Sequence, residues 1–163
     1  MKLLYRVVIS VICIILNTQF IAMVKIKEQN FIDTQNIQSI NVYNNGKTMS
    51  YCENDEVFKN IVHCYENTIK NCHIMPALGV SINDEIEVEI MRGVWLEFVY
   101  NGVYCSDGMP YQRLLFNIGI GHGGVCLHRY NNNKYEGRCF YIALDNKNFD
   151  DLYCLINNVV LGK

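Results

Sequence analysis

The stretch EIEVEIMRGVWLEFVY, residues 85–100, carries the clearest periodic pattern of the chain. Apolar and acidic residues alternate strictly in its first half, which predicts a half-buried strand. Its second half, VWLEFVY, is apolar apart from Glu97 and predicts another strand, in which alternate residues share one face. A three-residue loop at 91–93, with Gly93 in a left-handed conformation, would place both apolar faces on the same side. The side chains then expected to face the core are those of Ile86, Val88, Ile90, Val94, Leu96, Phe98 and Tyr100.

The opposite face of the same two strands is a candidate binding surface. Four glutamates and the only tryptophan of the chain would share that side of the sheet. Charged faces of this kind are commonly just solvated, but a tryptophan exposed among carboxylates is typical of an anchor for a partner. We therefore expect a surface for a protein or peptide partner of basic character, formed by Glu85, Glu87, Glu89, Trp95 and Glu97.

The elements around this stretch extend the pattern into an α+β fold. Residues 39–51 predict a hairpin with Asn45-Gly46 at its tip. Residues 54–70 predict a helix with one apolar face, and Asn148 would cap a closing helix. No β-α-β alternation follows residue 85, so we expect a largely antiparallel sheet, an N-terminal hairpin followed by a strand meander, with the two helices packed on one face.

The N-terminus has the pattern of an export signal. Lys2 and Arg6 precede an apolar run at residues 7–16, which continues with few interruptions to Val24 and approaches the length that crosses a bilayer. We expect an exported, secreted or membrane-anchored protein in three parts. These are a signal peptide or membrane anchor, a polar tether and a single α+β domain, at residues 1–24, 25–36 and 37–163.

Composition excludes two broad classes. Half of the residues are apolar and 18% are charged, which argues against a disordered chain. The net charge is −2 and no cluster of Lys and Arg occurs, whereas a nucleic-acid binder normally carries a basic patch. We expect no nucleic-acid partner.

The loop GIGHGGVCLH, residues 119–128, combines the glycine spacing of a dinucleotide site with possible metal ligands. A dinucleotide site needs a helix after its third glycine, and here the residues after Gly124 alternate like a strand. His122, Cys126 and His128 belong to no C-x-x-C pair, and neighbouring residues of a strand point to opposite faces. We therefore expect a strand connection, with no cofactor and no metal.

Cys52, His122 and Asp145 support an alternative, nucleophilic catalysis. Cys52 precedes the predicted helix, whose dipole would lower the pKa of a thiol, and His122 stands at the head of a strand. With the stretch GHGGVCLHRYNNN…RCFYIALDN, this order resembles the papain-like cysteine hydrolases. The resemblance implies Cys52 as nucleophile, His122 as base, and Asp145 or Asn146 as the orienting residue.

The residues that follow Cys52 argue against that alternative. They read ENDE, and their three acids oppose a thiolate. Our leading interpretation is therefore a non-catalytic binding domain, of which immunity and inhibitor proteins are one type.

The last hairpin predicts a pair of cysteines. A two-residue turn at Asn132-Asn133 would set Cys126 opposite Cys139, near the separation that a disulfide spans. A longer loop through Gly137 would instead set Cys126 opposite Ile142. With the shorter turn, we expect a Cys126–Cys139 disulfide in an oxidising compartment and two adjacent thiols in a reducing one.

Overall fold

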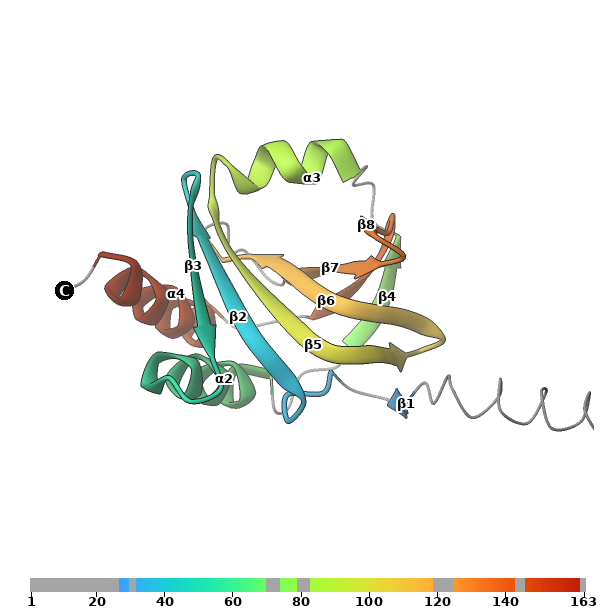
Figure 1. Cartoon of the computed structure of the whole chain (residues 1–163), viewed down its shortest axis with the longest axis horizontal. Coiled ribbons are helices and arrows are strands. Elements are labelled where there is room, and N and C mark those ends of the chain that lie inside the picture. The colour runs from blue at the N-terminus through green and yellow to red at the C-terminus, as the bar shows by residue number, and fades with distance from the viewer. Residues whose placement is uncertain are drawn as a thin grey trace, which may run out of the picture.

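A mostly antiparallel sheet forms the centre of the protein, with helices on both of its sides (Figure 1). The structure is a computed structural model, and it describes residues 27–29, 32–69, 74–78, 83–118, 125–142 and 146–161. The strands follow the path β3-β2-β5-β6-β7-β9-β4, while β1 pairs with β5 and β8 pairs with β7. The expected α+β class with a largely antiparallel sheet is confirmed.

The elements have the following bounds. The first half of the chain supplies β1 (Lys27–Gln29), β2 (Ile37–Asn44), β3 (Lys47–Cys52), α2 (Glu56–Ile69), β4 (Ile74–Leu78) and α3 (Asn83–Ile90). The second half supplies β5 (Val94–Ser106), β6 (Met109–Asn117), β7 (Val125–Asn131), β8 (Lys134–Tyr135), β9 (Arg138–Ile142) and α4 (Asn146–Leu161).

The N-terminal hairpin and the helix after it match the sequence prediction. Asn44 pairs with Lys47, so the turn has two residues, and Asn45 and Gly46 have φ of 48° and 82°. Positive φ at both central positions is the type I′ geometry that suits the twist of the flanking strands. The helix predicted at 54–70 is α2, which buries Phe58, Ile61 and Tyr65.

The long strand β5 divides the molecule into two cores, because its side chains alternate between the two faces of the sheet. Leu96 and Phe98 belong to the main core, together with apolar side chains from both α2 and α4. Trp95 belongs to a second, smaller core, which includes Ile86 of α3. Figure 1 shows α3 on the side of the sheet opposite α2 and α4.

The prediction of a strand at 85–91 is wrong, because these residues fall within α3 and the turn that follows it. Ile86 is 1% exposed and Ile90 is half-buried, whereas Val88 between them is 50% exposed. Residues four apart share one face of a helix, while a buried strand face would also have required Val88. The alternating sequence satisfies both periods, and glutamate is a good helix former.

Part of the segment expected to be a tether belongs to the sheet. Residues 27–29 form β1, which pairs in parallel with residues 104–106 of β5, and Ile32 and Asp33 are buried. The closing helix begins at Asn146, two residues before the expected cap at Asn148. None of the helices in the described ranges has the length and hydropathy to span a membrane. The leader predicted at residues 1–24 lies outside the described residues.

Candidate functional site

Trp95 is a buried anchor for α3. Its side chain is 2% exposed and packs with Ile86, Leu115 and Tyr135. The indole Nε1–H donates a hydrogen bond to the main-chain oxygen of Glu89, at 3.1 Å. The expectation that Trp95 lies exposed on the outer face is therefore wrong, because α3 covers the side of the sheet that a hairpin would have left open.

Gly93 allows this close packing. A Cβ atom at position 93 would lie 2.8 Å from Nε1 of Trp95, closer than real side chains approach. Gly93 does not have the left-handed conformation expected from the sequence, since the described glycines with positive φ are Gly46 and Gly108. The residue is small because the indole ring needs the space.

Glu97 is a buried carboxylate at the centre of a polar network. It is 0% exposed. Its Oε2 accepts hydrogen bonds from Asn41 Nδ2 at 2.7 Å and from Tyr43 Oη at 2.8 Å, and its Oε1 accepts one from Tyr135 Oη at 2.9 Å. Arg113 lies 3.9 Å from Oε1. The expected exposure of Glu97 is wrong, and these donors explain how its charge is accommodated away from bulk solvent.

The aromatic partners of Glu97 stay protonated. Burial, and then the charge of Glu97, raise the pKa of Tyr43 and of Tyr135 well above the usual value. The guanidinium of Arg113 stacks 4.5 Å from the ring centre of Tyr130, which in turn contacts the Tyr135 ring edge-on. Because their pKa values are raised, the hydroxyls of Tyr43 and Tyr135 remain hydrogen-bond donors to the Glu97 carboxylate throughout the physiological pH range.

His128 lies on the same face of the sheet and is neutral there. Its ring centre is 6.0 Å from that of Trp95, and its buried Nδ1 has no hydrogen-bond partner among the described residues. Burial lowers the pKa of His128 from 6.5 to about 4. No group of three or more His, Cys, Asp or Glu side chains in the described part of the chain is arranged to hold an ion, and His122, the third candidate ligand, lies outside that part.

The outward side of α3 carries the three remaining glutamates of the expected surface. Glu85, Glu87 and Glu89 are exposed on this helix. Val88 is 50% exposed, and Met91, which follows the helix, is 59% exposed. The five residues predicted to share one face are thus divided by α3, with three glutamates outside it and the two β5 residues beneath it.

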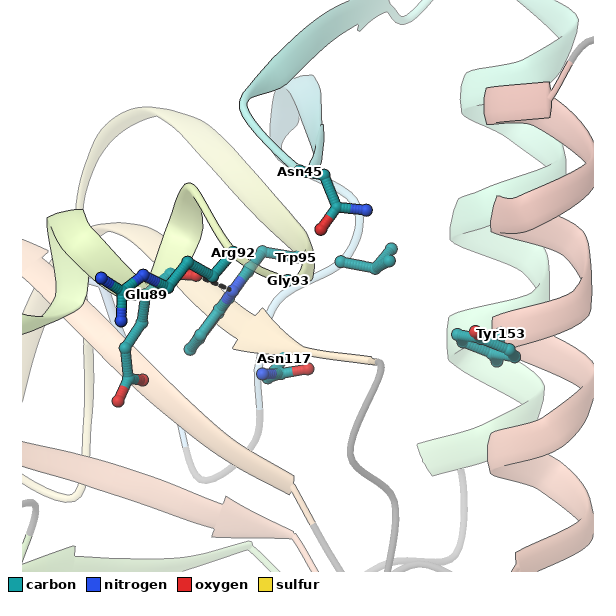
Figure 2. A pocket seen from close by; sticks show the side chains of 8 residues that line it. Asn45, Glu89, Arg92, Gly93, Trp95, Asn117 and Tyr153 are labelled. Carbon is teal, nitrogen blue, oxygen red and sulfur yellow. Dashed lines mark hydrogen bonds between the residues drawn. The ribbon is translucent and has the colours of Figure 1, made fainter.

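A pocket of about 480 Å³ opens at the end of α3 (Figure 2). Its wall is formed by Asn45, Gly93, Val94, Trp95, Asn117 and Tyr153, with Glu89 and Arg92 on the α3 side. These residues come from the β2–β3 turn, the α3–β5 loop and the adjoining strand ends, and from α4. In Figure 2, the side chains of Glu89 and Arg92 extend on the far side of the Trp95 ring from Tyr153. Asn45, Asn117 and Tyr153 were not predicted from the sequence.

The proposed catalytic residues are not assembled by the described part of the chain. Cys52 is exposed at one end of β3. Ile118, the last described residue before the loop that contains His122, bonds to Val94 at the other end of the sheet. His128 is four strands away from β3, about 19 Å along the sheet. His122 and Asp145 lie outside the described residues, so the hydrolase alternative stays a prediction.

The register of the last hairpin differs from both alternatives. The two-residue turn at Asn132-Asn133 is present, and it pairs Tyr130 with Tyr135. However, Cys126 pairs with Tyr141. Two extra residues lie between Glu136, whose N–H still bonds to the oxygen of Arg129, and Phe140, which pairs with Leu127, so the register shifts by two.

The two cysteines of this hairpin are therefore diagonal neighbours, and both are free thiols. Burial and the adjacent Cys126 raise the pKa of Cys139 to about 11. The expectation that they stand directly opposite each other is wrong.

Comparison with protein-family models, with curated protein sequences and with solved structures found no match to this chain.

Proposed function

We propose that this protein is a small non-catalytic binding domain, exported or held at a membrane by its N-terminal segment. Its partner is a basic protein or peptide that docks on the outward side of α3. Proteins of the immunity or inhibitor type fall within this class. The observation that carries the proposal is the mixture of exposed apolar and acidic side chains on and just after α3: Glu85, Glu87, Val88, Glu89 and Met91.

The chemistry of this surface supports a protein partner. Exposed Val88 and Met91 offer apolar contact area, and Met adapts its shape to different partners. Glutamates at the rim of such a patch attract a basic partner and reject an acidic one. Among the described helices, α2 and α4 pack against the other face of the sheet, so α3 is the one whose exposed side chains lie on this side.

The position of α3 is fixed from below, which also supports a binding role. Ile86 is buried in the smaller core, and the hydrogen bond from Trp95 holds the main chain at Glu89. A helix held in place in this way loses little conformational freedom when a partner docks on it, so less of the binding energy is spent on ordering.

A peptide titration tests the proposal. The probe is a blocked hexapeptide of sequence Lys-Leu-Lys-Lys-Leu-Lys, and isothermal calorimetry at low and high salt measures its affinity. We expect binding that weakens as salt rises, and a threefold to tenfold loss, on the order of two exposed charge pairs, in the double variant Glu85→Gln/Glu87→Gln.

A matched variant makes the result specific to α3. Glu53→Gln/Asp151→Asn removes the same charge from other exposed positions and should leave the affinity unchanged. Val88→Ser should lower the affinity equally at low and high salt, because it removes apolar contact and no charge. Equal affinities for the wild type and the α3 charge variant would contradict the proposal.

A further inference from the structure

We propose that the pocket beside Tyr153 is the specificity site of this binding domain, and that it takes one aromatic or large aliphatic side chain of the partner together with its flanking peptide groups. The inference rests on the proposed function for the nature of the partner, a peptide. It adds which part of that peptide is selected and by which residues.

The lining of the pocket carries one acidic and one basic side chain, Glu89 and Arg92, so its formal charges cancel. Figure 2 shows Asn45 and Asn117 on the side of the Trp95 ring that faces Tyr153, and the charged ends of Glu89 and Arg92 on the other side. A lysine or arginine side chain placed there would lose water and would meet the Arg92 guanidinium as well as the Glu89 carboxylate, so the lining gives it no net attraction. Basic residues of a partner are therefore expected over α3, and an uncharged residue in the pocket.

The lining offers what one peptide residue needs. Tyr153 is 37% exposed and presents its ring, and Val94 adds apolar surface. The amide of Asn45 donates one N–H to Asn44 Oδ1 at 2.8 Å, and its second N–H and its C=O are the pair of groups that a peptide bond requires. The volume of about 480 Å³ lies at the small end of ligand pockets, which suits one large side chain and the adjoining main chain.

Main-chain hydrogen bonds pre-form the pocket. Asn45 N–H donates to the oxygen of Gly93 at 3.0 Å, and Ile118 N–H donates to the oxygen of Val94 at 3.0 Å. These bonds tie the β2–β3 turn and the end of β6 to the loop that leads from α3 into β5. Three segments far apart in sequence are thereby fixed around the pocket, so little conformational entropy is lost when a ligand binds there.

The test uses a small uncharged probe, N-acetyl-phenylalanine amide, which carries one ring and two amide groups. Trp95 is the only tryptophan and lines the pocket, so its indole N–H resonance in a ¹H–¹⁵N spectrum reports binding. We expect a saturable shift with a dissociation constant of about 1 mM, as is usual for a ligand of this size. N-acetyl-alanine amide, which lacks the ring, should give no saturable shift.

Two variants locate the probe. Tyr153→Ala should weaken binding about tenfold through the loss of ring contact. Cys154→Ala, at the next and also exposed position of α4, is the matched control and should bind like the wild type. Because both positions are exposed, circular dichroism is expected to show intact folds.

The outcomes separate this inference from the proposed function. Glu85→Gln/Glu87→Gln should leave the affinity for the uncharged probe unchanged while it weakens the lysine–leucine peptide. Equal binding of the two blocked amino acids, or full affinity in Tyr153→Ala, would overturn the pocket assignment whatever the charged peptide does. The assignment would also fail if methyl β-glucoside gave a saturable shift and the phenylalanine probe gave none.

Discussion

Replacement of the buried Glu97 by glutamine should destabilise the fold far more than the same change at an exposed glutamate. The side chain keeps its size, but the carboxylate that accepts from Asn41, Tyr43 and Tyr135 becomes a neutral amide with one acceptor oxygen and one N–H₂ group. The least costly orientation turns the amide oxygen toward Asn41 and Tyr43. The N–H₂ group then faces Tyr135, whose hydroxyl must reverse from donor to acceptor.

The magnitude follows from these contacts. Hydrogen bonds to a charged acceptor contribute roughly 1.5–3 kcal/mol, about twice as much as those between neutral groups. Two bonds that lose their charge and one that is reversed cost about 2–4 kcal/mol together. The ion pair adds little, because the Arg113 side chain is 41% exposed and its nitrogen lies 3.9 Å away. The smaller cost of burying a neutral amide offsets part of the loss.

Urea unfolding, followed by the emission of Trp95, measures the effect. Glu53→Gln, an identical change at an exposed position, is the control and should alter the free energy of unfolding by less than about 0.5 kcal/mol. If the slope of the unfolding free energy against urea concentration is the same in Glu97→Gln as in the wild type, unfolding exposes the same amount of surface in both. A loss below about 1 kcal/mol for Glu97→Gln would refute the view that the network depends on a charged acceptor.

Two more predictions concern the neighbours of Trp95. The pKa of His128 is about 4 in the fold and 6.5 without burial, so its contribution to stability is complete above about pH 6.5 and is lost as pH falls toward 4. Urea unfolding at pH 7 and at pH 4.5 should give free energies of unfolding that differ by up to about 1.4 kcal/mol per pH unit because of this group. An equal dependence on pH in His128→Phe would contradict this prediction. Gly93→Ala should destabilise by about 1–3 kcal/mol, because its Cβ would meet Trp95 at 2.8 Å. Gly102→Ala, where the nearest atom is 4.0 Å away, should have little effect, and a small change at both positions would refute the steric argument.

The sequence predicts those elements whose pattern allows one interpretation. The Asn-Gly tip of the β2–β3 hairpin is typical of a two-residue hairpin turn, and α2 has several apolar residues at helical spacing. The segment at 85–90 is different, since its apolar residues are compatible with both periods and the helix is only eight residues long. Only the burial of its surroundings distinguishes the two, and burial depends on the tertiary fold.

The network around Glu97 depends on register, which the sequence does not reveal. Alternation along β2 places Asn41 and Tyr43 on its polar face, and β2 pairs Asn41 with Glu97 and Tyr43 with Trp95. This pattern can be interpreted only once β2 and β5 are known to be neighbours. The sequence does not show that they are, because the two segments lie more than fifty residues apart. The cysteine register was missed for a similar reason, because the two extra residues that follow Glu136 leave no clear pattern in the sequence.

The change from strand to helix at α3 also changes what the candidate residues can do. In a hairpin, Trp95 and Glu97 would have contacted a partner directly, and their loss would have weakened binding without affecting the fold. Beneath α3 they are positioning residues, since Trp95 holds the main chain of Glu89 and Glu97 orders the strands that support it. Their substitution should therefore lower stability and partner affinity together, whereas changes at Glu85 or Val88 should lower affinity alone.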